Sequence, residues 1–270
     1  MANNDQSNYM YMSAEGKINY NMTNDYMFRV VLQKNEETLK RLIASVLHLK
    51  YEQIKSVKIE NPINLSDEID GKEYQMDVAV TLNDDTFINL EMQVINYDNW
   101  PERSLMYLCR RFDKLARGKD YKEARPVFHI GFLDFTLFKC HPEFFAKYQL
   151  RNEKDNSLYT DKFNLFVLEL NHTELATDED KAYGIDTWAR LFKATTWEEI
   201  KMITQENETL KSTAESIYES NADWVTIEKC RAREDAIIHE QYMTNRIKEL
   251  EEENATLYAK IADLESKLQK

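Results

Sequence analysis

Two acids and an amide stand at regular spacing in the segment YQMDVAVTLNDDTFINLEMQVI. Apolar and polar residues alternate on both sides of a polar turn, a pattern that predicts a hairpin with strands at 74–82 and 86–95. The even-numbered residues of both strands are apolar and should face the core. Because strand side chains alternate between the two faces, Asp77, Glu91 and Gln93 should share the outward face.

The register of this hairpin decides which of the three polar side chains meet. A three-residue turn at 83–85 sets Asp77 directly opposite Glu91. Moving the turn to 84–86 sets Asp77 opposite Gln93, with Glu91 on the diagonal. Both registers gather the three groups into one cluster.

Two carboxylates that face each other across a strand pair repel, at a cost of up to about 1 kcal/mol. A divalent cation between them reverses the sign of that interaction, and Mg²⁺ is commonly held by one or two carboxylates together with waters and substrate phosphates. Asp77 and Glu91 are therefore a candidate metal site. The alternative is a solvated strand face on which the acids lie apart, since the chain has 48 acidic residues.

The net charge of −13 over 270 residues disfavours a polyanionic partner such as nucleic acid. Its distribution changes that conclusion. Residues 1–150 hold 19 Lys and Arg against 22 Asp and Glu, a balance of −3, and residues 151–270 hold 16 against 26, a balance of −10. The acidity is mostly a property of the second half, so the first half remains compatible with DNA.

Cysteine use and hydropathy restrict the cellular compartment in which we expect the chain. Cys109, Cys140 and Cys230 are far apart and show no CxxC spacing, which favours a reducing cytoplasm over a disulfide framework or a zinc site. No run approaches the roughly 18 apolar residues of a membrane span, and the first residues lack the apolar segment of a signal peptide. We expect a cytoplasmic chain with no membrane partner.

The order of predicted elements indicates the fold class. Helical patterns occupy 23–33, 35–48 and 99–119, strand patterns occupy 54–62 and 125–135 besides the hairpin, a second hairpin is expected within 144–170, and everything from Asp178 onward reads as helix. Predicted N-terminal caps are Thr23 or Asn24, Asn35, Asp98 or Asn99, and a capping box of Thr196 with Glu199. This order predicts an α/β (α+β) fold with one central sheet flanked by helices.

The expected organisation has four parts. Residues 1–20 are polar and without periodicity and should be flexible. The main domain should cover 21–195, followed by a helical region at 196–235 and a coiled-coil tail at 236–270.

The tail has the most regular pattern in the chain. Apolar residues and one asparagine alternate at spacings of three and four, a heptad seam made of Ile247, Leu250, Asn254, Leu257, Ile261, Leu264 and Leu268. Ile at position a with Leu at position d favours a parallel dimer, and a single Asn at a fixes the register. Arg246 would then face Glu251 of the second copy, and Lys260 would face Glu265. The alternative is an amphipathic helix docked on its own core.

The ordered segments TNDYMFRVVL, MDVAV, INLEMQV, ERSLMYLCRRFDKLARGKDY and RPVFHIGFLDF resemble those of the PD-(D/E)XK nuclease superfamily. The resemblance is to Rpn-family recombination-promoting nucleases and transposase-like proteins, and it covers about residues 21–195. It implies a restriction-endonuclease-like core with a mixed central sheet.

By this resemblance Asp77 and Glu91 would hold Mg²⁺ (or Mn²⁺), with the backbone carbonyl of Met92 as a further ligand. Gln93 stands where the motif usually has Lys, and would orient the attacking water by a hydrogen bond. It lacks the positive charge of Lys and is a poor base. An acid on the first helix often assists in the superfamily; among Asp25, Glu36 and Glu37 we favour Asp25, which is equally well placed to be an ordinary helix-start residue.

The segment after the hairpin supplies positive charge. Residues 103–125 carry eight Lys and Arg against three acids, a balance of +5. Arg103, Arg110, Lys114 and Arg117 recur at helical spacing and should lie along one flank, where they could contact DNA phosphates. The alternative for them is a solvated, charged helix face.

These observations lead to two main hypotheses. The first is a Mg²⁺-dependent DNA endonuclease that forms a homodimer through 247–268. The second is a catalytically weak or inactive nuclease-fold protein that acts as a DNA-associated or protein-binding scaffold. A transposase that transfers DNA strands is a third reading, which depends on the family resemblance alone.

Overall fold

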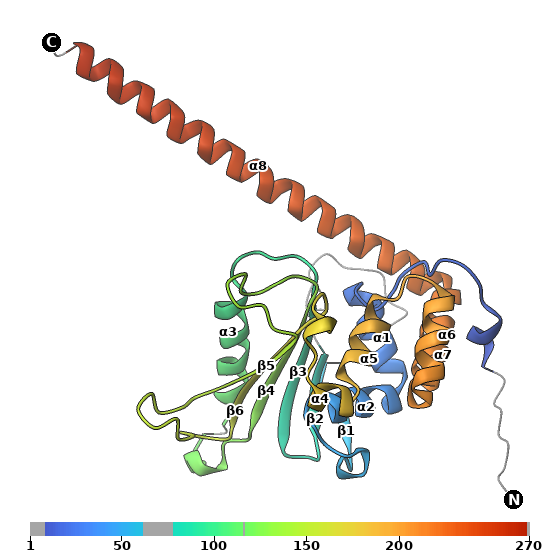
Figure 1. Cartoon of the computed structure of the whole chain (residues 1–270). Coiled ribbons are helices and arrows are strands. Elements are labelled where there is room, and N and C mark those ends of the chain that lie inside the picture. The colour runs from blue at the N-terminus through green and yellow to red at the C-terminus, as the bar shows by residue number, and fades with distance from the viewer. Residues whose placement is uncertain (1–8, 62–77, 116, 269–270) are drawn as a thin grey trace, which may run out of the picture. The chain divides into compact units, whose positions relative to one another are not determined.

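The computed structural model describes residues 9–61, 78–115 and 117–268 (Figure 1). The chain divides into two compact units, Met1–Cys230 and Arg231–Lys270. The first unit is a mixed α/β domain with a central sheet flanked by helices, so the fold class predicted from the element order is confirmed.

The sheet has six strands in the order β1-β2-β3-β4-β6-β5. The central strands β3, β4 and β6 are parallel, and β1, β2 and β5 join them in antiparallel pairs. The sheet is therefore mixed. Its strands are β1 (Val57–Ile59), β2 (Val78–Leu82), β3 (Thr86–Gln93), β4 (Val127–Leu133), β5 (Phe145–Gln149) and β6 (Phe163–Glu169).

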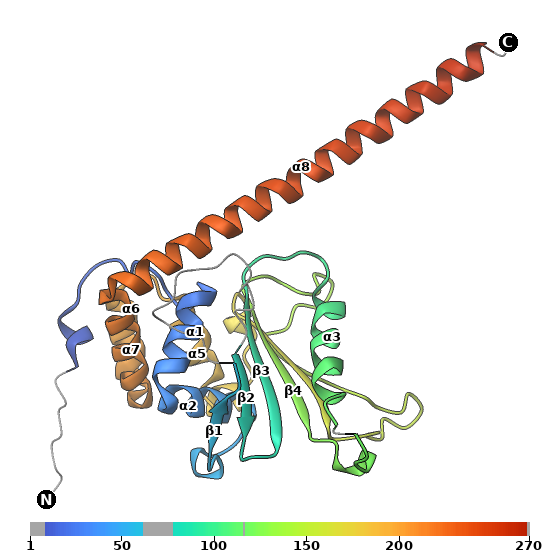
Figure 2. The ribbon, with the colours of Figure 1, turned by 180° about the vertical axis from the view of Figure 1, so that it is seen from behind.

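Helices cover both faces of the sheet (Figures 1 and 2). On one face lie α1 (Asp25–Lys34), α2 (Glu36–Val46) and α5 (Ile185–Lys193), with the short α4 (Asp178–Ala182) beside α5. Behind this layer pack α6 (Trp197–Glu206) and α7 (Lys211–Ala222). The opposite face is covered by α3 (Trp100–Phe112), the helix that connects the parallel strands β3 and β4.

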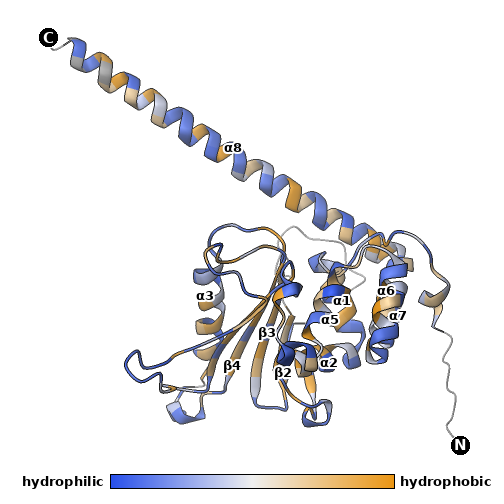
Figure 3. Cartoon of the chain, viewed as in Figure 1, coloured by the Kyte–Doolittle hydropathy of each residue, from blue (hydrophilic) through white to orange (hydrophobic). Residues whose placement is uncertain are grey.

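The main core lies between the sheet and the α1 layer, and it includes the hairpin residues Val78, Val80, Leu82, Ile88, Leu90 and Met92. Phe28 of α1, Phe132 of β4 and Phe192 of α5 meet there with ring centroids 5.4 to 5.7 Å apart. Figure 3 shows the apolar residues gathered on the strands and on the helix faces that cover them. Tilted and edge-on ring pairs of this kind contribute packing energy beyond their buried area.

The starts of α1, α2 and α6 follow the predicted caps, whereas Asn99 stands at the cap position of α3 without a side-chain capping hydrogen bond. The side chain of Asn24 accepts hydrogen bonds from the backbone N–H groups of Tyr26 and Met27, and Asn35 caps α2 in the same way. Thr196 and Glu199 form the expected capping box at the start of α6. These side chains satisfy backbone donors that have no partner inside the helix.

The N-terminal segment differs from the expectation of a flexible 1–20. Within the described part, Tyr11 is fully buried and its hydroxyl donates to Thr204 Oγ1 at 2.9 Å. Backbone groups of Met10 and Tyr11 donate to the carboxylate of Glu215 on α7. The polar composition of the segment gave no indication of the buried Tyr11, which contacts α6, or of the backbone contacts with α7.

The helix α3 is shorter than the sequence pattern suggested. It ends at Phe112 and is followed by turns, because Asp113 forms the C-terminal cap. Lys114 and Arg117 therefore do not lie on the same helical flank as Arg103 and Arg110, and that part of the expectation was wrong.

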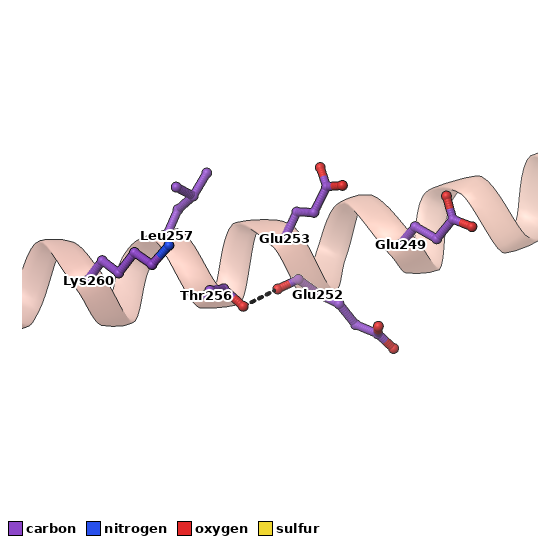
Figure 4. A pocket seen from close by; sticks show the side chains of 6 residues that line it. All are labelled: Glu249, Glu252, Glu253, Thr256, Leu257 and Lys260. Atoms are coloured by element: carbon purple, nitrogen blue, oxygen red, sulfur yellow. Dashed lines mark hydrogen bonds between the residues drawn. The ribbon is translucent and has the colours of Figure 1, made fainter.

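The second unit is a stretch of the long helix α8 (Trp224–Leu268), whose first turns belong to the first unit. The described seam residues Ile247, Leu250, Leu257, Ile261 and Leu264 are all exposed. Charged side chains flank them. Figure 4 shows Leu257 near Lys260 and Glu253, with Glu249 further along the helix, on a shallow surface formed by this helix alone.

Among the described residues, no helix combines the length and the apolar character needed to cross a membrane.

The crossing of α3 over the sheet depends on Gly131. A Cβ atom added to Gly131 would come within 2.7 Å of Cη2 of Trp100, closer than carbon atoms approach without repulsion. We expect Gly131→Ala to lower the free energy of unfolding by about 1–3 kcal/mol, because the core would be overpacked. Urea denaturation measures this loss.

The double variant Gly131→Ala/Trp100→Leu is the matched control for that clash. If the indole causes the loss, adding Gly131→Ala to Trp100→Leu should cost less than adding it to the wild type. Equal costs in both backgrounds would contradict the clash.

Candidate active site beneath helix α3

The predicted hairpin forms, with its turn at 83–85. Val78 pairs with Leu90 and Leu82 pairs with Thr86, which is the first of the two registers considered from the sequence. Asn83 and Asp84 adopt positive φ angles, which these two residue types tolerate better than most. Asp77 itself lies outside the described residues, so its expected position opposite Glu91 stays a prediction.

Glu91 is 4% exposed, although its face of the hairpin was expected to point outward. The difference arises because α3 packs over this face of the sheet on β4 and β6, and its Arg103 reaches Glu91 on the neighbouring strand β3. Both faces of the central strands are therefore covered, as is usual for parallel strands in α/β folds. Glu91 is therefore not part of a solvated strand face, so the alternative is wrong for this acid; whether Asp77 lies apart from it stays untested.

Arg103 of α3 supplies the charge that compensates this buried acid. Its Nε lies 2.8 Å and its Nη2 lies 2.7 Å from Oε1 of Glu91. The guanidinium is partly exposed, so it reaches from the surface of α3 down to the strand. The carboxylate is thus held by two charge-assisted hydrogen bonds, which are stronger than neutral ones.

His129 of β4 lies beside the same carboxylate and is fully buried. Its Nε2 is 3.5 Å from Oε2 of Glu91, and Nδ2 of Asn89 is 3.2 Å from its Nδ1. Because an amide nitrogen can only donate, Nδ1 acts as acceptor and a neutral ring carries its proton on Nε2, the side toward Glu91. Burial, and next the positive charge of Arg103, lower the pKa of His129 to about 3.

Aromatic side chains of α3 close the space around His129. The ring of Tyr107 stacks on the imidazole at 5.8 Å, and Trp100 lies 5.5 Å away. The guanidinium of Arg103 also lies over the Tyr107 ring, at 5.5 Å from its centroid. These contacts fix the orientation of the groups that contact Glu91.

Two of the remaining predicted catalytic and metal-binding residues lie on β3 with Glu91, and the third lies on α1. Gln93 follows Glu91 on the same face of β3, is half-buried, and donates from Nε2 to the carbonyl of Ile95 at 2.9 Å. Met92 points to the other face, into the main core. Asp25 is the buried first residue of α1, which packs on the face away from α3.

The four predicted DNA-binding residues are not equivalent. Arg103 binds Glu91, whereas Arg110, Lys114 and Arg117 are exposed. Arg103 therefore belongs to the candidate active site, and the other three lie toward the C-terminal end of α3 and the turns after it.

The described residues do not by themselves form a metal site. No group of three or more His, Cys, Asp or Glu side chains within them is arranged to hold an ion. Glu91 supplies a hard oxygen donor, the type that divalent cations prefer, beside the Arg103 guanidinium that already compensates its charge. The second acid expected beside it, Asp77, belongs to the undescribed segment.

Sequence reasoning did not identify Asn89 and His129. The sequence did contain a signal for both residues. Asn89 is odd-numbered like Glu91 and so lies on the same face of the strand, and His129 interrupts an otherwise apolar strand. What could not be read from the sequence is the parallel pairing that sets Asn89 directly beside His129 and Glu91 beside Gly131.

A mixed sheet with a buried glutamate on a central strand, reached from a crossover helix, is consistent with the restriction-endonuclease-like fold of PD-(D/E)XK nucleases. A family model described as "PD-(D/E)XK nuclease family transposase" matches residues 22–246, and the chain belongs to that family. The matched residues extend past 195 into the helices that follow and the start of the tail. Comparisons with curated proteins and with solved structures each gave no match.

The depressed pKa of His129 predicts acid sensitivity of the metal-free fold. The unfolded chain, with an ordinary histidine pKa near 6.5, takes up the proton before the folded chain does, so stability falls as pH drops below about 6.5 toward 3. For this one group the loss between pH 7 and pH 5 is about 2 kcal/mol. Urea denaturation in EDTA at both pH values measures it.

The variant His129→Gln should lose less stability than the wild type over the same pH interval. His141→Gln, which changes an exposed histidine, serves as the control and should keep the wild-type dependence. An unchanged pH dependence in His129→Gln would mean that this histidine is not held neutral by burial.

Proposed function

We propose that this protein is a divalent-metal-dependent DNA endonuclease that hydrolyses phosphodiester bonds. The observation that carries the proposal is the carboxylate of Glu91, buried on a central strand within a chain of the PD-(D/E)XK nuclease family. A buried carboxylate costs free energy unless a cation compensates it. Residues with a purely structural role seldom bury a carboxylate. The burial of Glu91 therefore supports a functional role for this residue.

Asp77, Glu91 and the backbone carbonyl of Met92 would hold Mg²⁺ or Mn²⁺. When bound, the ion supplies an activated water and neutralises charge that builds up on the scissile phosphate. Arg103 already provides a positive charge at Glu91 and would keep its carboxylate oriented. His129 and Asn89 restrict the same carboxylate from the other side.

Gln93 and Asp25 complete the proposed catalytic set. Gln93 shares the face of Glu91 and would orient the attacking water through its amide, which can donate and accept. Asp25 would assist from α1. Arg103, Arg110, Lys114 and Arg117 would contact DNA phosphates, which position a duplex without reading its sequence.

A second candidate function is a scaffold on DNA or on another protein, without strong catalysis. Two observations favour it: a glutamine stands at position 93 in place of the usual lysine, and Arg103 is bound to Glu91. Strand transfer, as in a transposase, is supported by the family description. We place any of these functions in the cytoplasm, in keeping with the three free cysteines.

We propose in addition that the protein is a homodimer through residues 247–268. The exposed apolar seam of α8 supports this, because a solvent-exposed row of Ile and Leu at heptad spacing stabilises a helix only when covered. Charge complementarity favours a second copy in parallel register as the partner, since Arg246 meets Glu251 and Lys260 meets Glu265. Two copies would bring two nuclease sites to the two strands of a duplex.

Plasmid nicking tests the nuclease. With Mg²⁺ or Mn²⁺ the wild type should nick supercoiled DNA, and Glu91→Gln and Asp77→Asn should each reduce the rate at least about a hundredfold, because each removes one negatively charged ligand. Calorimetric titration with Mn²⁺ should show weaker binding for both variants. These substitutions keep the size of the side chain.

Asp98→Asn is the matched control, since Asp98 is exposed in the loop that leads into α3. It should nick and bind Mn²⁺ like the wild type. Equal nicking by all four proteins would indicate a contaminating nuclease. Absence of both nicking and Mn²⁺ binding in the wild type would favour the scaffold.

Light scattering coupled to size exclusion tests the dimer. The wild type should have twice the mass of one chain, and Leu257→Glu should shift it toward the monomer, because the substitution places a charge in the seam. Ala259→Glu adds the same charge at an exposed position on the side of the helix away from the seam and should remain dimeric. A monomeric wild type at micromolar concentration, or a dimer unaffected by Leu257→Glu, would contradict the proposal.

A further inference from the structure

A cavity of about 390 Å³ lies at the C-terminal end of α3, away from Glu91. It opens between the last turn of this helix, the residues that follow it, and the starts of β3 and β4. Four basic and two aromatic side chains line it: Phe87, Arg111, Phe112, Lys114, Lys119 and Arg125. This volume is in the usual range for small-molecule sites.

The cavity is positively charged in a chain whose net charge is −13. Among the described residues that line it, the one acid is Glu123, which gives a local balance of +3. The charge of Glu123 is already compensated, since Oε2 accepts from Nζ of Lys119 at 2.9 Å and Oε1 accepts from the backbone N–H of Asp120. Within the described part of the chain, Arg111 and Lys114 form no ion pair.

The aromatic side chains set this cavity apart from a simple anion site. The guanidinium of Arg125 lies 5.2 Å from the centroid of the Phe87 ring, a cation–π contact that holds both groups at the cavity wall. Phe112 is kept in place by an edge-on contact with Phe163 at 5.9 Å. Flat apolar rings beside fixed cations are the combination that binds a nucleobase together with its phosphate.

We infer that this cavity binds one nucleotide of a DNA strand, with the phosphate against Arg111 and Lys114 and the base against Phe87 and Phe112. The inference rests on the proposed function, which makes DNA the substrate, and adds a second anchoring point to it. An acidic peptide would satisfy the cations but not the aromatic wall, so we favour the nucleotide.

The position of the cavity relative to Glu91 suits this role. Phe87 and Glu91 lie on the same face of β3, four residues apart, so their backbones are separated by about 13 Å. That is about four base-pair steps along a duplex axis. A strand that reaches Glu91 would thus be held a few nucleotides away, by residues that take no part in chemistry.

Binding without catalysis tests the inference. Fluorescence anisotropy with a short fluorescein-labelled single-stranded oligonucleotide, in EDTA, should show that Phe87→Leu weakens binding about tenfold, because leucine cannot stack on a base. Lys114→Ala should reduce the slope of log affinity against log salt concentration by about one, because one phosphate contact is lost. Lys114 is exposed, so this variant should fold normally.

Lys181→Ala is the matched control, because it removes the same charge from an exposed position on α4, on the other side of the sheet. It should bind within about twofold of the wild type. Adenosine monophosphate and a poly-glutamate peptide serve as competitors. Competition by the nucleotide supports a nucleotide site, and equal competition by the peptide would overturn it.

The result separates the inference from the proposed nuclease. Oligonucleotide affinity equal to wild type in Phe87→Leu and in Lys114→Ala would overturn the cavity assignment even if the wild type nicks plasmid. Loss of affinity in both variants would support the assignment even if no nicking is seen. A wild type that does not bind the oligonucleotide would overturn it as well.

Discussion

A carboxylate beneath a helix requires a positive charge nearby, and the pairing of Glu91 with Arg103 meets this requirement. Much of what surrounds the pair follows from it. The helix α3 must pass over β4 beside Glu91, and β4 must leave room for the helix there, which Gly131 provides. An ion pair that is buried on one side and exposed on the other is costly to separate but remains open to exchange with solvent or a ligand.

The polar row on this face of the sheet contrasts with the apolar packing behind it. On the α1 side the central strands present a mostly apolar surface, on which Phe132 packs against Phe28 of α1 and Phe192 of α5. On the α3 side the same strands carry Asn89, Glu91 and His129. A domain of this size can bury such polar groups on one side because the other side supplies most of the hydrophobic stabilisation. The α1-side face of the sheet thus provides most of the hydrophobic stabilisation, and the α3-side face carries the candidate site.

Much of the fold was accessible from sequence because its signals are local. Each of these signals depends on neighbours within a few positions. They are the helix caps such as Asn24 and Thr196, the alternation of apolar and polar residues in the hairpin, and the length of the strands. The candidate site was only partly accessible. The burial of Glu91 results from the placement of α3, and the contact of His129 with Asn89 results from parallel pairing across 40 positions. Tyr11 gave no periodic signal, so its packing against α6 and α7 could not be foreseen.

The position of Arg103 only 12 residues after Glu91 has a consequence for how the domain assembles. The acid lies at the end of a hairpin that can form early from local contacts, and the arginine lies on the connection that follows immediately. When that connection folds back over the sheet it delivers the counter-ion at the same moment that it excludes water from the acid. Folding therefore needs no intermediate in which the uncompensated charge of Glu91 is buried in an apolar environment. The docking of α3 on the sheet and the pairing of Arg103 with Glu91 are one event.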